Sequence, residues 1–432
     1  MARPVFIIDG SRTPFLKARS GPGPFTPVDL AVQCGRPLLA RQPFAPDAFD
    51  QVILGCVNVI ADEMNPARVA ALRLGMGEAM VAFTVQINCG SGMQSIDTGY
   101  RTIRDGTADL ILAGGAESLS HAPLVFSRGA VNWYARLFGA RSLGARLSAL
   151  LGFRPGFLKP VIGLERGLTD PITDLNMGQT AELVGHLFHV TRRDADQYAA
   201  ESQQRLAAAQ RDGFFADEIE PAFARDGTVY DHDDGVRPDS SADALAKLKP
   251  AFERPWGKVT AGNSSQITDG ASWVILASEE AVARHKLTPR AVIVDSEWSA
   301  LDPAVMGLGP VYCATALLRR HGLALDDIEL WELNEAFAAQ VLGCLAAWQD
   351  DEFCRDALGR AGAAGGVPRE RLNVDGGAIG VGHPVGASGN RIVLHLVNAM
   401  KRMGKRRGIA TECIGGGQGG AMLIEAVDGV RP

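Results

Sequence analysis

The 432-residue chain repeats itself in outline, and this repeat constrains its fold more than any other feature. An apolar strand pattern that ends at an aspartate occurs at 3–14 and again at 290–300. A second pair, at 49–57 and 326–337, has an acidic start, continues as an apolar strand and leads into polar loop residues. We therefore expect two similar halves that pack as pseudo-twofold mates.

A third pair combines a glycine-rich turn, a helix and a strand that ends in glycines. In the first half it runs from Cys89 to Ser118, and in the second half it runs from 376 to 425. Strands that alternate with helices in this order favour parallel sheets with crossover helices. The repeat also predicts that Cys89 and His383 begin equivalent helices, and that Cys413 lies at the strand end equivalent to Gly114.

Functional groups of such folds gather at the carboxyl ends of the strands. We therefore expect Cys89, His383 and Cys413 to converge there, together with the loop that holds Asn334 and Glu335. Taken one at a time, each residue has a structural interpretation: a core cysteine, a structural histidine, or a pair that caps a helix.

The sequence around Cys89 predicts a strand end followed by a helix. Met93, Ile96 and Ile103 recur at helical spacing, and Asp105-Gly106 is a typical stop signal. The positive end of a helix dipole stabilises a thiolate, so we expect a lowered thiol pKa and a nucleophile at Cys89.

The expected neighbours extend this chemistry. His383 is suited to accept the thiol proton, and the backbone N–H groups of Cys89 and Gly415 are suited to hold an oxyanion. Cys413 supplies a second thiol, which a simple acyl hydrolase does not need. Together these groups can pass an acyl group onto a thiol and then onto a carbanion, which makes a carbon–carbon bond or, in reverse, cleaves one.

Four short motifs carry a resemblance to a known family: CGS at 89–91, NEAF at 334–337, GHP at 382–384 and CIG at 413–415. In their order and over essentially the whole length, the chain resembles the thiolases (acetyl-CoA C-acyltransferases). The resemblance implies an α/β thiolase fold, with two βαβαβαββ halves in layered α-β-α-β-α packing and an inserted, mainly helical loop domain. The implied division is 1–120 with 251–285, then 121–250, then 286–432.

The resemblance also implies roles for the catalytic residues. Cys89 is the nucleophile that becomes S-acylated, and His383 activates it and later joins a water on Asn334 in a thioester oxyanion hole. Cys413 is the acid/base for the acetyl-CoA methyl group. The N–H groups of Cys89 and Gly415 form the second oxyanion hole, and Glu335 orients neighbouring groups.

Coenzyme A and acyl-CoA are implied as substrates, with no covalently bound cofactor and no metal. The implied coenzyme A contacts lie along a tunnel that leads to the cysteines. They are Ala261, Ser265, Arg237, Met177 and Phe337.

The stretch 350–373 resembles the branch of thiolases that serve as subunits of fatty-acid β-oxidation complexes, so we expect thiolysis of 3-ketoacyl-CoA. A short-chain biosynthetic acetoacetyl-CoA thiolase and a non-catalytic, thiolase-like lipid-binding protein are the alternatives. A ketosynthase-type condensing enzyme has no second cysteine acid, so Cys413 argues against that class.

Charge and cysteine usage exclude other classes. The net charge of −6 gives no polycation for nucleic acid, and the seven scattered cysteines fit neither a disulfide framework nor a zinc site. The N-terminus has no secretory pattern, and no apolar run is long enough to span a bilayer, so we expect a cytoplasmic protein. As partners the resemblance implies a homodimer or a dimer of dimers, with the apolar segment 81–87 as a candidate sheet edge.

One segment departs from the acidic character of the chain. Residues 118–164 contain no Asp or Glu, and their arginines alternate with aromatic and leucine side chains. This pattern predicts one or two basic amphipathic helices, suited to a membrane surface or to a hydratase/dehydrogenase subunit of a β-oxidation complex. Alternatively, the apolar residues dock the inserted layer onto the core.

Overall fold

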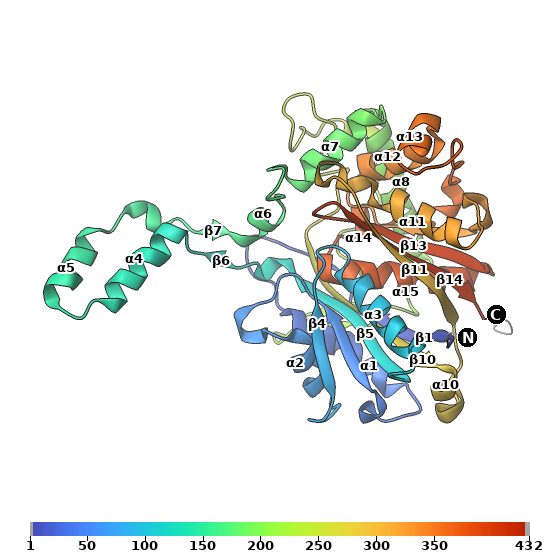
Figure 1. The fold of residues 1–432 in the computed structure, drawn as a ribbon, viewed down its shortest axis with the longest axis horizontal. Coiled ribbons are helices and arrows are strands. Elements are labelled where there is room, and N and C mark those ends of the chain that lie inside the picture. Colours follow the sequence, from blue (N-terminus) through green and yellow to red (C-terminus); the bar gives the residue numbers. More distant parts are fainter. Residues whose placement is uncertain (1–2, 428–432) are drawn as a thin grey trace.

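The structure is a computed structural model and describes residues 3–427. Ten strands form one sheet in the order β12-β13-β14-β11-β1-β10-β5-β3-β4, with β2 beside β10 (Figure 1). Their bounds are β1 (Val5–Arg12), β2 (Leu16–Lys17), β3 (Gln51–Gly55), β4 (Val81–Val85), β5 (Leu110–Ser118), β10 (Thr268–Ser278), β11 (Ala291–Ala300), β12 (Leu330–Leu333), β13 (Arg407–Ile414) and β14 (Gln418–Ala426). Two small ribbons pair β6 (Leu124–Val125) with β7 (Val161–Ile162) and β8 (Ala222–Phe223) with β9 (Val229–Tyr230).

Fifteen α-helices lie in the described residues. They are α1 (Pro27–Ala40), α2 (Pro66–Arg73), α3 (Ser91–Arg104), α4 (Arg128–Gly139), α5 (Leu143–Leu151), α6 (Gly163–Gly167), α7 (Met177–Leu187), α8 (Arg192–Arg211), α9 (Ala242–Leu245), α10 (Glu279–His285), α11 (Gly309–Arg320), α12 (Ala338–Gln349), α13 (Asp351–Asp356), α14 (Ala378–Val381) and α15 (Val385–Met403). None of them is both long and apolar enough to cross a membrane.

The strand order confirms the predicted repeat. The first half reads β4-β3-β5-β10-β1, and the second half reads β12-β13-β14-β11 in the equivalent places. A single parallel bridge from Trp331 to Leu372 takes the place of β4 in the second half. β1 and β11 both shift register immediately before their aspartates, Asp9 and Asp295, so these strands match in detail as well.

The expectation of parallel sheets is wrong in part. Strand β3 is parallel to β4 and β5, and β12 is parallel to β13. However, β10 and β14 run antiparallel to both of their main neighbours. A strand that follows its neighbour through a short turn, as β14 follows β13, can only return antiparallel.

The layers match the predicted α-β-α-β-α packing. Helices α3 and α15 pack on each other between the two half-sheets, where a core joins residues of both halves, such as Ile96 and Val393. Helices α1 and α2 cover the outer face of the first half-sheet, and α11 covers that of the second. Within residues 3–427, the halves pair directly only through the short β1–β11 ladder, so the central helices hold them together.

Local signals account for the helix that matters most to the site. Met93, Ile96 and Ile103 of α3 are fully buried, as their spacing predicts. The helix ends at Arg104, and Gly106 follows with a φ of 78°. A left-handed residue just after a helix end favours glycine, which explains the stop signal.

The inserted segment 121–250 divides into two parts. Helices α7 and α8 pack against α12 of the second half, whereas α4 and α5 extend away from the body on the β6–β7 ribbon (Figure 1). The pair of helices predicted within 118–164 is therefore present. The alternative that its apolar residues dock onto the core is wrong, since Leu143 and Leu151 are more than 80% exposed (82% and 83%). The domain limits proposed from the sequence stay a prediction.

Candidate active site

Two helix starts meet at the centre of the molecule. Cys89 precedes α3 by two residues and His383 precedes α15 by two, as the repeat predicts. Three residues after each of them is a glycine, Gly92 and Gly386. A side chain on Gly92 would come within 3.0 Å of the Gly386 carbonyl oxygen, so only glycine permits this approach. The two starts are therefore packed backbone to backbone.

The Cys89 loop is fixed by the residue before the cysteine. Asn88 adopts a left-handed conformation with a φ of 47°, which asparagine tolerates better than most residues. Its Nδ2 donates to the Gly415 carbonyl oxygen at 2.8 Å. This bond ties the Cys89 loop to the loop after β13, in which Gly415 lies.

The Cys89 thiol is protonated at rest. Cys89 keeps some solvent exposure, but burial of its thiol raises its pKa to about 11. The nearby Gly415 N–H opposes this rise without cancelling it. The expectation that the helix start lowers the thiol pKa is therefore wrong, because desolvation outweighs the dipole and the N–H contacts.

His383 is placed as a neutral base. Burial, with a smaller contribution from the charge of Arg391, lowers the pKa of His383 to about 4. Its Nδ1 lies 2.6 Å from the Ser388 hydroxyl, and its Nε2 is buried with no partner in residues 3–427. Because Ser388 also donates to the Pro384 carbonyl oxygen, it accepts from Nδ1–H, which leaves the Nε2 lone pair free.

Cys413 is the second thiol of the site. It lies near the end of β13 and is 1% exposed. Burial, and next the proximity of Cys89, raise the pKa of Cys413 well above its ordinary value. Its apolar neighbours are Met306, Ala336, Met177 and Phe337. The two cysteines of the motifs are thus close to each other, and neither is ionised at neutral pH.

Asn334 presents unpaired polar atoms. It follows β12 and its backbone N–H donates to the Thr411 carbonyl oxygen, two residues before Cys413. The side chain is 1% exposed, yet neither its Oδ1 nor its Nδ2 has a partner in the described part of the chain. A buried amide without partners is the group that a water or a ligand satisfies.

Glu335 connects separate segments. It accepts hydrogen bonds from Tyr198 Oη at 2.9 Å, Ser202 Oγ at 2.6 Å, Asn373 Nδ2 at 3.0 Å and the Ile379 N–H at 3.2 Å. These donors belong to α8, to the loop before α14 and to α14 itself. The carboxylate therefore holds the inserted helices and the segment leading to His383 in one arrangement.

The interpretation of Asn334 and Glu335 as a helix cap is wrong. Helix α12 begins later, at Ala338, and its preceding residue Phe337 makes no side-chain cap.

Two of the residues expected to contact coenzyme A, Ala261 and Ser265, lie in the segment that leads into β10. Ser265 donates its N–H to the Ala336 carbonyl oxygen at 2.9 Å, and the next carbonyl oxygen, of Gln266, accepts from the His383 N–H. The segment 263–266 therefore spans the loops of Asn334 and His383. Ala261 is exposed at the outer end of this segment.

Of the other three expected contacts, Met177 and Phe337 pack in one apolar cluster with Cys413. Met177 begins α7, after a cap by Asn176, and its sulfur would lie 3.2 Å from a side chain on Gly415. Phe337 packs edge-on against Phe252. Arg237 bonds through its N–H to Gln203 Oε1, and its guanidinium has no ion pair within residues 3–427.

Three residues of the site were not found from the sequence: Asn88, Ser388 and Glu117. Glu117 is buried at the end of β5 and accepts from the N–H groups of Val57, Asn58 and Gly386. Burial raises its pKa to about 7. Of the three, only Asn88 had a usable signal, since asparagine before a helix start tolerates a positive φ.

The chain is similar to known proteins over almost its whole length. Residues 5–280 match the N-terminal domain of thiolases, and residues 287–426 match the C-terminal domain. The chain is 40% identical to the beta-ketoadipyl-CoA thiolase of Pseudomonas aeruginosa, over 99% of this chain and 100% of that protein. It is 36% identical to the mitochondrial trifunctional enzyme subunit beta of Bos taurus, over 98% of this chain and 88% of that protein.

A solved structure shares the fold. The crystal structure of human mitochondrial 3-ketoacyl-CoA thiolase in complex with CoA superposes with a TM-score of 0.83 at 36% sequence identity, and the match covers 98% of each chain.

Proposed function

Because this chain belongs to the thiolase family of acyltransferases, we propose that it cleaves 3-ketoacyl-CoA with coenzyme A, through an acyl group carried on Cys89. The products are acetyl-CoA and an acyl-CoA shortened by two carbons, and the reaction is reversible. One observation supports this assignment above the others: a neutral histidine with a free, buried Nε2 begins the helix that packs on the start of the Cys89 helix, and Cys413 lies close to Cys89.

In the first half-reaction the Cys89 thiol attacks the 3-keto carbon while its proton passes to His383 Nε2. The N–H groups of Cys89 and Gly415 hold the oxyanion that forms. The bond between carbons 2 and 3 then breaks and leaves the acyl group on Cys89. The leaving enolate of acetyl-CoA takes a proton from Cys413, and its thioester oxygen is held by His383 and by a water on Asn334.

In the second half-reaction coenzyme A replaces acetyl-CoA. Its thiol gives its proton to the Cys413 thiolate and attacks the Cys89 thioester. The bond between the acyl group and Cys89 then breaks, and Cys89 recovers its proton from His383. Since the resting thiols and imidazole are uncharged, charge develops only during the reaction, where fixed N–H groups stabilise it most effectively.

We infer a role in fatty-acid β-oxidation from the similarity to the trifunctional enzyme subunit beta. A short-chain biosynthetic role remains the alternative within the family. The similarity to a beta-ketoadipyl-CoA thiolase adds 3-ketoacyl groups that end in a carboxylate to the substrates worth testing. A non-catalytic role is disfavoured, because Cys89, His383, Asn334 and Cys413 are all retained.

The test is the rate of thiolysis across 3-ketoacyl-CoA substrates of increasing chain length, with 3-ketoadipyl-CoA as the carboxylate-bearing member. A β-oxidation enzyme shows its highest kcat/KM on medium or long chains. Activity confined to acetoacetyl-CoA would support the biosynthetic alternative, and a preference for 3-ketoadipyl-CoA would replace the fatty-acid substrate. Absence of thiolysis on every member would refute the proposed reaction.

We also propose a homodimer, or a dimer of dimers, formed through β4. This strand is the last of the sheet, and Val81 at its start is 56% exposed. An apolar edge strand favours pairing with a second copy. A monomer mass in light scattering at micromolar concentration would contradict this. The expected hydratase/dehydrogenase partner and the cytoplasmic location stay predictions.

A further inference from the structure

The helical pair α4 and α5, with the ribbon that carries it, forms an arm of unusual composition. We define the arm as residues 124–162, closed at its base by the β6–β7 pairing of Leu124 with Ile162. Twelve of the 25 exposed large apolar side chains in the described part of the chain lie in these 39 residues. A soluble protein rarely leaves so much apolar surface together unless the surface binds something.

The apolar surface follows a helical stripe. Leu143, Leu147, Leu150 and Leu151 of α5 recur at the spacing of one helix face, and each is more than half exposed. The opposite face of α5 is the one that packs on α4, because Ala149 is buried there and its carbonyl oxygen accepts from Trp133 Nε1 at 2.8 Å. The leucine stripe therefore points away from α4.

The charge of the arm has one sign. Its six cationic residues are Arg128, Arg136, Arg141, Arg146, Arg154 and Lys159, and it contains no acidic residue. None of these six makes an ion pair with any residue of 3–427. Since the whole chain carries −6 and the arm +6, the rest of the chain carries −12. The arm is thus a localised cation on an acidic body.

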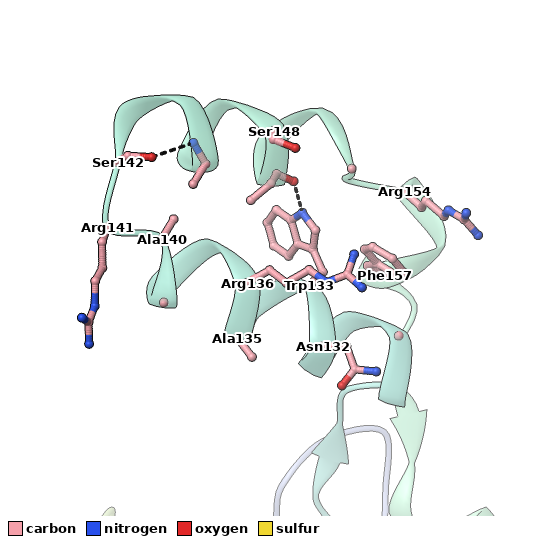
Figure 2. A pocket seen from close by; sticks show the side chains of 15 residues that line it. Asn132, Trp133, Ala135, Arg136, Ala140, Arg141, Ser142, Ser148, Arg154 and Phe157 are labelled. Atoms are coloured by element: carbon pink, nitrogen blue, oxygen red, sulfur yellow. Dashed lines mark hydrogen bonds between the residues drawn. The ribbon is translucent and has the colours of Figure 1, made fainter.

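Some of these cations border a cleft between the two helices (Figure 2). The cleft measures about 810 Å³ and has a floor of small residues with Trp133 and Phe157. Arg141 lies at one end of the cleft and Arg154 at the other, with Arg136 between them. Such a site combines apolar walls with guanidinium groups, which bind phosphate oxygens well.

We propose that the arm docks this protein onto an anionic phospholipid bilayer. The leucine stripe enters the boundary between headgroups and acyl chains, and the arginines of the cleft bind lipid phosphates. A protein partner would need a complementary acidic groove, whereas a bilayer supplies both the apolar layer and the negative charge. The combination of an exposed apolar stripe with unpaired cations therefore favours the lipid surface.

The negative charge of the body does not prevent the arm from binding an anionic bilayer, because the arm extends beyond the reach of that charge. A helix of 12 residues, such as α4, is about 18 Å long, whereas charges are screened over about 8–10 Å at physiological salt. The body charge is therefore screened at the arm. After β7, the chain reaches Met177 at the active site within 15 residues, so docking sets which side of the site faces the bilayer.

The experiment measures sedimentation of the full chain with vesicles of phosphatidylcholine alone and of phosphatidylcholine mixed with phosphatidylglycerol. We expect binding to the anionic vesicles only, weakening as salt increases. The charge variant is Arg136→Gln, Arg141→Gln and Arg154→Gln together. Each cation near an anionic surface contributes a factor of about five, so the triple variant should bind about a hundredfold more weakly.

A second variant tests the stripe without changing charge. Leu143→Ser, Leu147→Ser and Leu151→Ser together should also lose most vesicle binding, and these exposed side chains contribute little to folding. The matched control replaces three exposed arginines of the body, Arg211, Arg225 and Arg355, with Gln and should bind like the unmodified protein. All of these proteins should cleave short soluble substrates at the unmodified rate.

Several results would overturn the proposal. They are equal binding to neutral and anionic vesicles, an equal loss in the body control, or no loss in either arm variant. Absence of vesicle binding, with capture of a purified hydratase/dehydrogenase subunit through the arm, would reassign the surface to a protein. Because vesicle binding is read separately from thiolysis, this proposal and the proposed reaction can fail independently.

Discussion

The structure makes a quantitative prediction about the reactivity of Cys89. With a pKa of about 11, against an ordinary 9.0, the thiol is ionised in about one molecule in 10,000 at pH 7 rather than about one in 100. Because only the thiolate reacts, alkylation of Cys89 by iodoacetamide should be about a hundredfold slower than that of an ordinary thiol. Its rate should rise about tenfold per pH unit between about pH 6 and 10, with no plateau.

The alkylation rate is followed by mass spectrometry of the peptide that contains Cys89, over a pH series. The His383→Gln variant is the control for an ion pair. If the resting pair is neutral, as burial of both groups implies, this variant keeps the same pH profile. A plateau below about pH 8, or a profile that shifts in the His383→Gln variant, would show a thiolate–imidazolium pair and refute the reasoning.

Three further predictions concern single residues. Cys413→Ala should abolish exchange of the acetyl-CoA methyl protons, seen by NMR, while Cys89 still becomes acylated; wild-type exchange would remove Cys413 from the mechanism. His383 should contribute a fall of about 3 kcal/mol in the free energy of unfolding as pH drops from about 6.5 to about 4, because the unfolded chain takes up a proton that the buried imidazole does not. Denaturant titrations should show this contribution as the difference between the pH profiles of the unmodified protein and His383→Gln, and identical profiles would contradict it. Glu335→Ala leaves the buried donors of Tyr198, Ser202 and Ile379 without their acceptor and should cost at least about 3 kcal/mol. Asn334→Ala breaks no side-chain hydrogen bond within residues 3–427 and should lower kcat with a change in stability below about 1 kcal/mol; equal stability losses in the two variants would contradict this contrast.

The features that the sequence predicts are those that local patterns carry. The spacing of Met93, Ile96 and Ile103 gives α3 and its buried face, and the repeat of strand and glycine patterns gives the equivalence of the two halves. The motifs also place Cys89 and His383 before equivalent helices. Each of these signals lies within a few residues along the chain, so no knowledge of distant contacts is required.

The features that the sequence does not predict depend on distant contacts. The pKa of Cys89 is set by burial against loops more than 300 residues away, which reverses the sign expected from the helix start alone. The Ser388 contact that orients His383, and the four donors that converge on Glu335, require the folded arrangement. Likewise, only the structure shows that the leucines of α5 are exposed.

The two thiols of the site come from different halves of the repeat: Cys89 belongs to the first and Cys413 to the second. The halves share little sheet pairing, and the central helices that join them contribute to a core that neither half completes alone. The order of events in folding follows from this arrangement. Each half can acquire its strands and helices before the active centre exists, and the centre forms only when the halves dock. During refolding, catalytic activity should therefore return after the helical signal, and the delay between them measures the docking step.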